Sequence, residues 1–259
     1  MPAPTTGDLA GKVAIVTGAS LGIGHAIAEL FAKHGAAVTI NYLRHADEAK
    51  ELAGKIEATG GRAIALKGDV ADTQDAESLV ATTVETFGRL DILVNNAGIE
   101  QQTPLLEIGE QDWDRTIAVD LKGPFFCLQA AARRMQQDGG SIVNISSIHE
   151  DLPFPGFTPY VAAKGGLRMV MRNASIELAE YGIRVNNVAP GAIATPINAA
   201  TLADPQKVKE LRRIVPLQRM GEPNEVAEVV LFLASDRASY VTGSTYYVDG
   251  GYVRHAEPL

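Results

Sequence analysis

The sequence TGASLGIG, residues 17–24, stands between a short apolar run and a segment with helical periodicity. Glycines at positions 18, 22 and 24 allow a tight turn and a close approach of the backbone to a pyrophosphate, whose charge the first N–H groups of the helix attract. A glycine triplet alone is a weak indication. Directly after a first strand, it predicts a dinucleotide site that opens a βαβ unit.

Around this stretch, β-rich runs alternate with helical segments along the whole chain. Several runs, such as VAIV, DILV and SIVNI, are almost continuously apolar, as is typical of strands covered on both faces. The predicted strands are Lys12–Thr17, Ala37–Asn41, Arg62–Lys67, Ile92–Asn95, Ser141–Ser146, Arg184–Ala189 and Ser244–Val248. The predicted helices are Gly22–His34, Ala46–Thr59, Thr73–Phe87, Glu110–Gln137, Pro159–Tyr181 and Pro223–Ala234. The alternation predicts an α/β fold with a doubly wound, Rossmann-type sheet of seven mainly parallel strands and helices on both faces.

The 259 residues are expected to form a single domain, because the chain contains no internal repeat, low-complexity tract or linker. The segment at about 190–220 interrupts the alternation and is too long for an ordinary connection. We expect it to form a lid over a site.

Composition limits the classes of partner. The formal net charge is −8 and no run of Lys or Arg occurs, so we expect neither nucleic acid nor a membrane surface as a partner. The opening MPAPTTGD lacks the pattern of a signal peptide, which predicts an unexported, cytoplasmic protein. Cys127 is the only cysteine and the histidines show no metal-ligand spacing, so no disulfide and no metal site are expected.

Three residues form a candidate catalytic group. Ser147 follows the fifth predicted strand, and Tyr160 and Lys164 lie one helical turn apart on one face of the next helix. Oxidation of an alcohol needs a base for the hydroxyl proton. Moving the pKa of a tyrosine from near 10 to neutrality requires about 4 kcal/mol, which a close ammonium can supply. We expect Tyr160 to accept the proton, Lys164 to lower its pKa and Ser147 to hydrogen-bond the reacting oxygen.

The TGxxxGxG spacing together with these residues resembles the short-chain dehydrogenase/reductase family along almost the full chain. Asn95-Asn96-Ala97-Gly98 resembles the family's NNAG element, and Asp69-Val70 its adenine-contacting pair. Pro190-Gly191 with Thr195 is similar to the segment that holds the nicotinamide. The cofactor contacts expected from this resemblance and from the strand ends are Gly18, Ser20, Leu21, Gly22, Ile23, Gly24, Asn41, Arg44, Asp69, Val70, Asn96, Ala97, Gly98, Tyr160, Lys164, Pro190, Gly191, Ile193 and Thr195.

The end of the second predicted strand bears on the choice between NAD and NADP. An acid there would bind the ribose 2′-hydroxyl and repel a 2′-phosphate. The chain has Asn41-Tyr42-Leu43-Arg44 instead, and Arg44 can pair with a phosphate. Leu21 stands where many NADP-dependent relatives have a basic residue. We therefore predict use of both cofactors, with NADP somewhat favoured.

One position departs from the family pattern. Family members usually have an asparagine in the helix after NNAG, where it supports a water relay to the lysine, whereas this chain has Asp120. An ionised carboxylate accepts hydrogen bonds but donates none, and its charge raises the pKa of neighbouring acids. Asp120 is thus a candidate for the relay, with a structural contact to the neighbouring loop as the alternative.

Residues beside the catalytic group bear on the substrate. Glu100, the His149-Glu150 pair and Asn198 lie in segments similar to those of the family's bacterial glucose 1-dehydrogenases. The resemblance implies oxidation of an aldose such as β-D-glucose at C1 to the lactone, with polar side chains satisfying the sugar hydroxyls. The expected substrate contacts are Glu100, Ser147, His149, Tyr160 and Asn198. Loop or subunit contacts are the alternative for Glu100, His149 and Asn198, and we expect Glu150 to be structural.

Other functions remain open at this point. Within the enzyme class, the alternatives are another sugar or polyol dehydrogenase, or a 3-oxoacyl thioester reductase. The reductase is less favoured, because its partner is an acidic carrier protein and this chain has no run of basic residues to bind it. A sensor or scaffold that only binds a dinucleotide is the alternative from another class. The resemblance also implies a homotetramer, for which the apolar segments Pro124–Ala132 and Leu167–Leu178 would provide interfaces.

Overall fold

The computed structural model describes residues 7–254, which form a seven-stranded sheet. The strands are β1 (Val13–Val16), β2 (Ala37–Tyr42), β3 (Arg62–Lys67), β4 (Ile92–Asn95), β5 (Gly140–Ile145), β6 (Ile183–Pro190) and β7 (Thr245–Val248). They lie in the order β3-β2-β1-β4-β5-β6-β7, and every neighbouring pair is parallel. The predicted fold class is confirmed, and the predicted strand ends are correct to within one residue.

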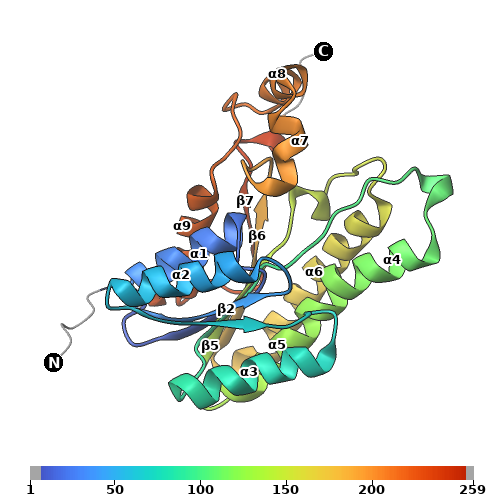
Figure 1. The fold of residues 1–259 in the computed structure, drawn as a ribbon. Helices are drawn as coiled ribbons and strands as arrows, with labels where there is room; N and C mark the ends of the chain where they lie inside the picture. Colours follow the sequence, from blue (N-terminus) through green and yellow to red (C-terminus); the bar gives the residue numbers. More distant parts are fainter. Residues whose placement is uncertain (1–6, 255–259) are drawn as a thin grey trace.

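Helices cover both faces of the sheet (Figure 1). One face carries α1 (Gly22–Lys33), α2 (Ala46–Ala58) and α9 (Pro223–Ala234), and the other carries α3 (Thr73–Phe87), α5 (Gly123–Met135) and α6 (Thr158–Glu177). Strand β1 contributes to two separate cores, since Ala14 and Val16 pack with α1 and α9 whereas Ile15 packs with α3 and α5. This alternation is the physical reason for the continuous apolar runs in the sequence.

The segment predicted as a single helix, Glu110–Gln137, is divided into three parts. Helix α4 (Glu110–Ile117) passes into a π-helical turn, η2 (Ala118–Lys122), and the chain continues as α5. A π turn inserts an extra residue into the helical repeat and often occurs at functional sites. The π turn η2 places the buried side chain of Asp120 beneath the loop that follows β4.

The segment after β6 contains helices that the sequence analysis left without structure. They are a short 3-10 turn, η5 (Pro196–Asn198), followed by α7 (Ala199–Leu202) and α8 (Pro205–Ile214). Asp204 caps α8 by accepting hydrogen bonds from the N–H groups of Gln206 and Lys207. Figure 1 shows α7 and α8 extending beyond the end of β6. Closure of this segment over a site stays a prediction.

The remaining short elements are 3-10 turns. They are η1 (Leu105–Glu107), η3 (Ile148–Glu150), η4 (Ala179–Tyr181), η6 (Asp236–Ala238) and η7 (Tyr252–Arg254). Within residues 7–254, none of the helices has the length and apolar character needed to cross a membrane. Cys127 is buried in α5.

Candidate active site

The loops after β1 and β4 meet where the strand order reverses, at the crevice where doubly wound sheets bind their ligands. Thr17 joins the two loops, because its hydroxyl oxygen accepts the N–H groups of Asn96 at 2.9 Å and Ala97 at 3.0 Å. The Asn96 amide donates in return to the carbonyl oxygens of Thr17 at 2.9 Å and Gly18 at 3.0 Å. The sequence analysis did not assign a role to Thr17, although it precedes the first glycine.

The glycine loop has the shape that a pyrophosphate requires. Gly18 and Gly22 have φ of +59° and +60°, a conformation that other residues rarely adopt. A Cβ at Gly24 would lie 2.4 Å from the Asn96 side-chain nitrogen and 2.6 Å from the Gly18 carbonyl oxygen. Helix α1 begins with no side-chain cap and no acidic residue in its first turn. Its first N–H groups thus remain available to an anion, and the loop fits a dinucleotide phosphate.

The other predicted cofactor residues border this loop. Asn41 supports it, accepting the Gly18 N–H at 3.2 Å and donating to the Gly68 carbonyl oxygen at 3.1 Å. Asp69 forms an ion pair of 3.1 Å with Arg115 of α4, a partner that the sequence analysis missed. Thr195 lies close to the glycine loop, because a Cβ added at Gly22 would lie 3.4 Å from the Thr195 methyl carbon. Direct contact of these residues with a cofactor stays a prediction.

The remaining members of the predicted set differ in exposure. Arg44 lies in the turn after β2, is exposed, and has no hydrogen bond or ion pair within residues 7–254. Ser20, Val70, Pro190 and Ile193 are buried. Leu21, Ile23, Ala97, Gly98 and Gly191 are half-buried or exposed around the same crevice.

The three candidate catalytic side chains come together from two elements. Ser147 follows β5, and Tyr160 and Lys164 lie one turn apart on α6. The Lys164 Nζ lies 5.4 Å from the centroid of the Tyr160 ring and donates to the Ile145 carbonyl oxygen at 3.2 Å. Lys164 is 4% exposed and Ser147 6% exposed, whereas Tyr160 is half-buried.

Burial and charge act in opposite directions on Tyr160. Burial raises the pKa of the phenol, whereas the Lys164 ammonium and a hydrogen bond with Ser147 lower it, and the net direction is upward. Asp120 and Glu100 add to the rise through their negative charge. Lys164 therefore acts on the pKa of Tyr160 in the expected direction, but its effect is smaller than the opposing effects. Desolvation of the phenolate is the physical reason.

Asp120 is an immediate partner of Lys164. Its Oδ1 lies 3.2 Å from the Lys164 Nζ, and its Oδ2 accepts the Ile99 N–H at 3.1 Å. Burial lowers the pKa of Lys164, but Asp120, Tyr160 and Glu100 raise it, and the net direction is upward. Lys164 therefore keeps its positive charge at neutral pH.

The candidate substrate residues differ in whether their polar atoms already form hydrogen bonds within the protein. Burial raises the pKa of Glu100, with a further rise from Asp120, which places this carboxyl within the field of the catalytic group. Burial lowers the pKa of His149, whose Nδ1 pairs with the Leu152 carbonyl oxygen at 3.3 Å, so the ring is neutral at pH 7. Asn198 donates to the Ile193 carbonyl oxygen at 2.8 Å. Substrate contact by these residues stays a prediction.

Glu150 connects the loop that carries Ser147 to three other elements. Its carboxylate accepts hydrogen bonds from Asn187 of β6 at 3.0 Å and Thr245 of β7 at 2.7 Å, and lies 3.5 Å from the Arg168 guanidinium of α6. Asn144 extends this network by bonding to Asn187 at 3.0 Å. Arg168 lies one turn after Lys164, a spacing that could have identified it in the sequence.

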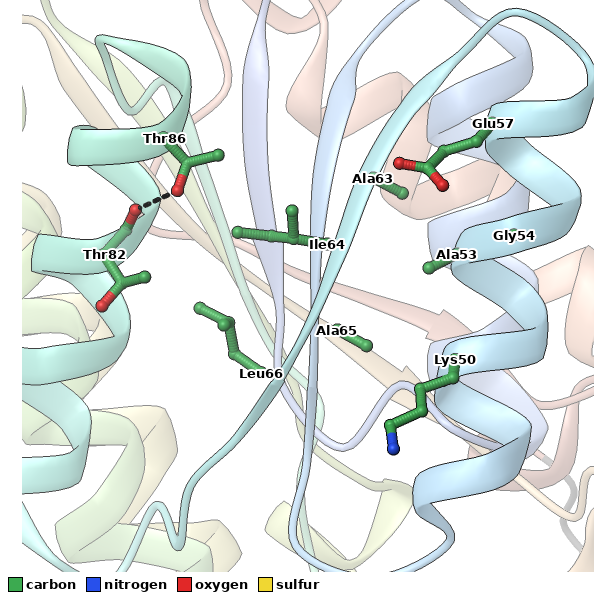
Figure 2. A pocket seen from close by; sticks show the side chains of 10 residues that line it. All are labelled: Lys50, Ala53, Gly54, Glu57, Ala63, Ile64, Ala65, Leu66, Thr82 and Thr86. Carbon is green, nitrogen blue, oxygen red and sulfur yellow. Dashed lines mark hydrogen bonds between the residues drawn. The ribbon is translucent and has the colours of Figure 1, made fainter.

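A separate hollow of about 460 Å³ lies at the edge strand β3. Figure 2 shows Lys50 and Ala53 of α2 on one side of the strand and Thr82 and Thr86 of α3 on the other. None of the predicted catalytic, cofactor or substrate residues lines it. It is therefore distinct from the crevice described above.

Comparison with known proteins identifies the family. A family model described as enoyl-(acyl carrier protein) reductase matches residues 18–253. A variant of a short-chain dehydrogenase/reductase from Serratia marcescens has a TM-score of 0.90 and 38% identity, covering 95% of this chain and 99% of its own. The chain belongs to the short-chain dehydrogenase/reductase family. It is accordingly an NAD(P)-dependent oxidoreductase.

Curated members of this short-chain dehydrogenase/reductase family act on different alcohols. L-rhamnose 1-dehydrogenase (NAD(P)(+)) of Sphingomonas sp. strain SKA58 is 46% identical over 94% of this chain and 96% of its own. 3beta-hydroxysteroid dehydrogenase 1 of Eggerthella lenta is 42% identical over 94% of both chains. Glucose 1-dehydrogenase 2 of Bacillus subtilis strain 168 is 40% identical over 97% of this chain and 98% of its own.

Proposed function

We propose that the protein oxidises the C1 hydroxyl of an aldose, such as β-D-glucose, to the lactone. The observation that carries this proposal is the position of Glu100, a half-buried carboxyl within the electrostatic field of Tyr160 and Lys164. A sugar offers several hydroxyls, and a half-buried carboxyl near the catalytic group would favour a ligand that can donate to it.

In this reaction Tyr160 takes the proton of the substrate hydroxyl as the hydride leaves the carbon. Lys164 stabilises the phenolate by its charge, and Ser147 holds the reacting oxygen by a hydrogen bond. The glycine loop and the first turn of α1 would hold the phosphates, and a nicotinamide bound beside Tyr160 would supply hydride acceptance at ring C4. The released lactone would hydrolyse in water.

We propose that both NAD and NADP are used, with NADP somewhat favoured. Arg44 supports this proposal, because it is exposed beside the end of β2 without a partner within residues 7–254, and no acid occupies the strand end. A guanidinium in this position can pair with a 2′-phosphate. Saturation curves that show NAD preferred by about a hundredfold or more, about 2.7 kcal/mol, would contradict the preference.

A hydroxysteroid substrate is the second candidate, because an apolar wall follows the serine loop. The rings of His149 and Phe154 are stacked with centroids 4.0 Å apart, and Phe154 stacks on Phe157 at the same distance. Such a wall would suit the apolar body of a steroid as well as the apolar face of a sugar ring. Polar residues beside Tyr160 favour the sugar.

The experiment is a substrate panel followed by the absorbance of reduced cofactor. The panel contains D-glucose, L-rhamnose, a polyol, a 3β-hydroxysteroid and, in the reverse direction, a β-ketoester, each with both cofactors. We expect turnover with at least one aldose at a kcat/KM about tenfold or more above that for the polyol and the steroid. Selective turnover of the steroid or ketoester would reject the proposal, and cofactor binding without any turnover would indicate a sensor.

We also propose a cytoplasmic homo-oligomer, with a tetramer expected from the family resemblance. Exposed apolar side chains of α5 and α6 support self-association: Phe125 is 39%, Met169 59% and Ile176 76% exposed. The sequence leaves open whether the tail Gly251–Leu259 reaches a neighbouring site, and its last part, 255–259, lies outside the described residues.

A further inference from the structure

The buried pair of Asp120 and Lys164 joins the π turn η2 to the helix that carries Tyr160. The Asp120 side chain has no exposed surface. Within residues 7–254, Lys164 is the only partner of its Oδ1, at 3.2 Å, while Oδ2 accepts the Ile99 N–H at 3.1 Å. Burial raises the pKa of Asp120 and determines the net direction, whereas both contacts lower it by stabilising the ionised carboxylate.

The backbone around Asp120 is shaped to admit this carboxylate. The π turn η2 carries it, and a Cβ at Gly98 would lie 2.7 Å from its Oδ1. A side chain at position 98 would therefore have to displace the carboxylate. Lys164 is held from its other side by the Ile145 carbonyl oxygen at 3.2 Å, so the ammonium lies between fixed acceptors.

The negative charges around Tyr160 oppose the ionisation of its phenol, and, within the described part of the chain, only Lys164 contributes a positive charge that favours it. Its charged neighbours are Lys164 of the same helix, Asp120 of η2 and Glu100 after β4, and the neutral hydroxyl of Ser147 after β5 hydrogen-bonds with it. One ammonium thus faces two carboxyls, of which that of Asp120 is fully buried and that of Glu100 is half-buried. A carboxylate that pairs with Lys164 offsets the positive charge that would otherwise favour loss of the phenol proton.

We propose that Asp120 is a positioning residue whose carboxylate holds the Lys164 ammonium beside the Tyr160 ring and offsets the positive charge that acts on the phenol. This inference rests on the proposed roles of Tyr160 and Lys164. It implies that the carboxylate determines the pH range in which the enzyme oxidises its substrate. An amide at position 120 extends that range toward lower pH.

The test is the ionisation of Tyr160 itself, measured without substrate or cofactor. Tyrosine labelled with ¹³C at the ζ carbon reports ionisation by NMR, and the Tyr160→Phe variant identifies the signal. The pH at which one tenth of Tyr160 is ionised is compared in the wild type and in Asp120→Asn, so the titration need not reach full ionisation. We expect this pH to fall by about one unit in Asp120→Asn.

Asp114→Asn is the matched control, because it removes an exposed carboxylate from the preceding helix α4. It should leave the Tyr160 titration where it is in the wild type. If Asp120→Asn does not fold, Asp120→Ser provides a second neutral side chain whose hydroxyl can accept the Ile99 N–H. An unchanged or higher ionisation pH in the folded neutral variant overturns the proposal.

The pH profile of kcat/KM for oxidation provides a second readout. Its rising limb should move to lower pH by the same amount in Asp120→Asn, whereas a purely structural defect would lower activity by a similar factor at every pH. The proposed function fails separately, if Tyr160→Phe retains turnover. The NMR titration does not depend on that outcome, since it needs neither substrate nor cofactor.

Discussion

The catalytic role of Tyr160 depends on opposing effects on the pKa of its phenol oxygen. Desolvation of the half-buried phenol raises its pKa, while Lys164 and Ser147 act to lower it. The hydroxyl proton of an alcohol goes to the phenolate, whereas reduction of a carbonyl needs the neutral phenol. The direction of the shift therefore favours the protonated form at neutral pH, so oxidation should be the more pH-sensitive direction.

The first prediction concerns this pH dependence. Because the pKa of Tyr160 is raised, the phenolate is the minor form at neutral pH and its fraction grows about tenfold per pH unit. We expect kcat/KM for oxidation to rise with a slope near one across about pH 6–8, and reduction to change little. Initial rates in both directions measure this, and a flat oxidation profile would contradict the assignment of the base.

At the scale of elements, the glycine loop provides the second prediction. Gly24→Ala places a Cβ 2.4 Å from the Asn96 nitrogen and should weaken cofactor binding at least about tenfold, because the loop must move. Gly54→Ala is the control, since no atom lies within 4 Å of its Cβ in α2. We expect the control to be more stable by about 0.5–1 kcal/mol and to bind normally. Calorimetry with NADPH and thermal unfolding measure the two effects.

The third prediction concerns the connection between the serine loop and α6. Glu150→Ala leaves Asn187, Thr245 and Arg168 without their buried acceptor, and should lower the free energy of unfolding by about 3 kcal/mol. Glu180→Ala, an exposed change near the end of α6, should stay within about 0.5 kcal/mol of the wild type. Urea unfolding measures both, and equal effects would show that the network does not stabilise the fold.

Elements could be predicted from the sequence where one local pattern determines them. Apolar runs and the residues after helix ends indicate the seven strands and most helix boundaries, and the strand ends place Ser147 near the glycine loop. The π turn at Ala118–Lys122 has no local signature, because the burial of Asp120 against Lys164 involves a residue of another helix. Helix α8 does have a local signal in the sequence, because Asp204 is a typical capping residue and Pro205 follows it in the first turn.

At the scale of the whole molecule, the fourth prediction tests self-association. Ile176 is 76% exposed on α6, near Met169 in sequence, and both are apolar. If α6 pairs between subunits, Ile176→Lys should lower the mass measured by light scattering from that of a tetramer, because a charge would be buried at the interface. A wild-type protein that is monomeric at micromolar concentration would reject the proposed assembly.

The central claim is that Tyr160 removes a proton from an aldose as hydride passes to the nicotinamide. The most direct measurement is the rate of reduced cofactor formation with D-glucose or L-rhamnose for the wild type and Tyr160→Phe, together with cofactor affinity for each. We predict wild-type turnover, a loss of about 10²–10⁴-fold or more in kcat for Tyr160→Phe, and nearly unchanged cofactor affinity. Retained turnover in Tyr160→Phe, or no turnover of any aldose by the wild type, would contradict the account.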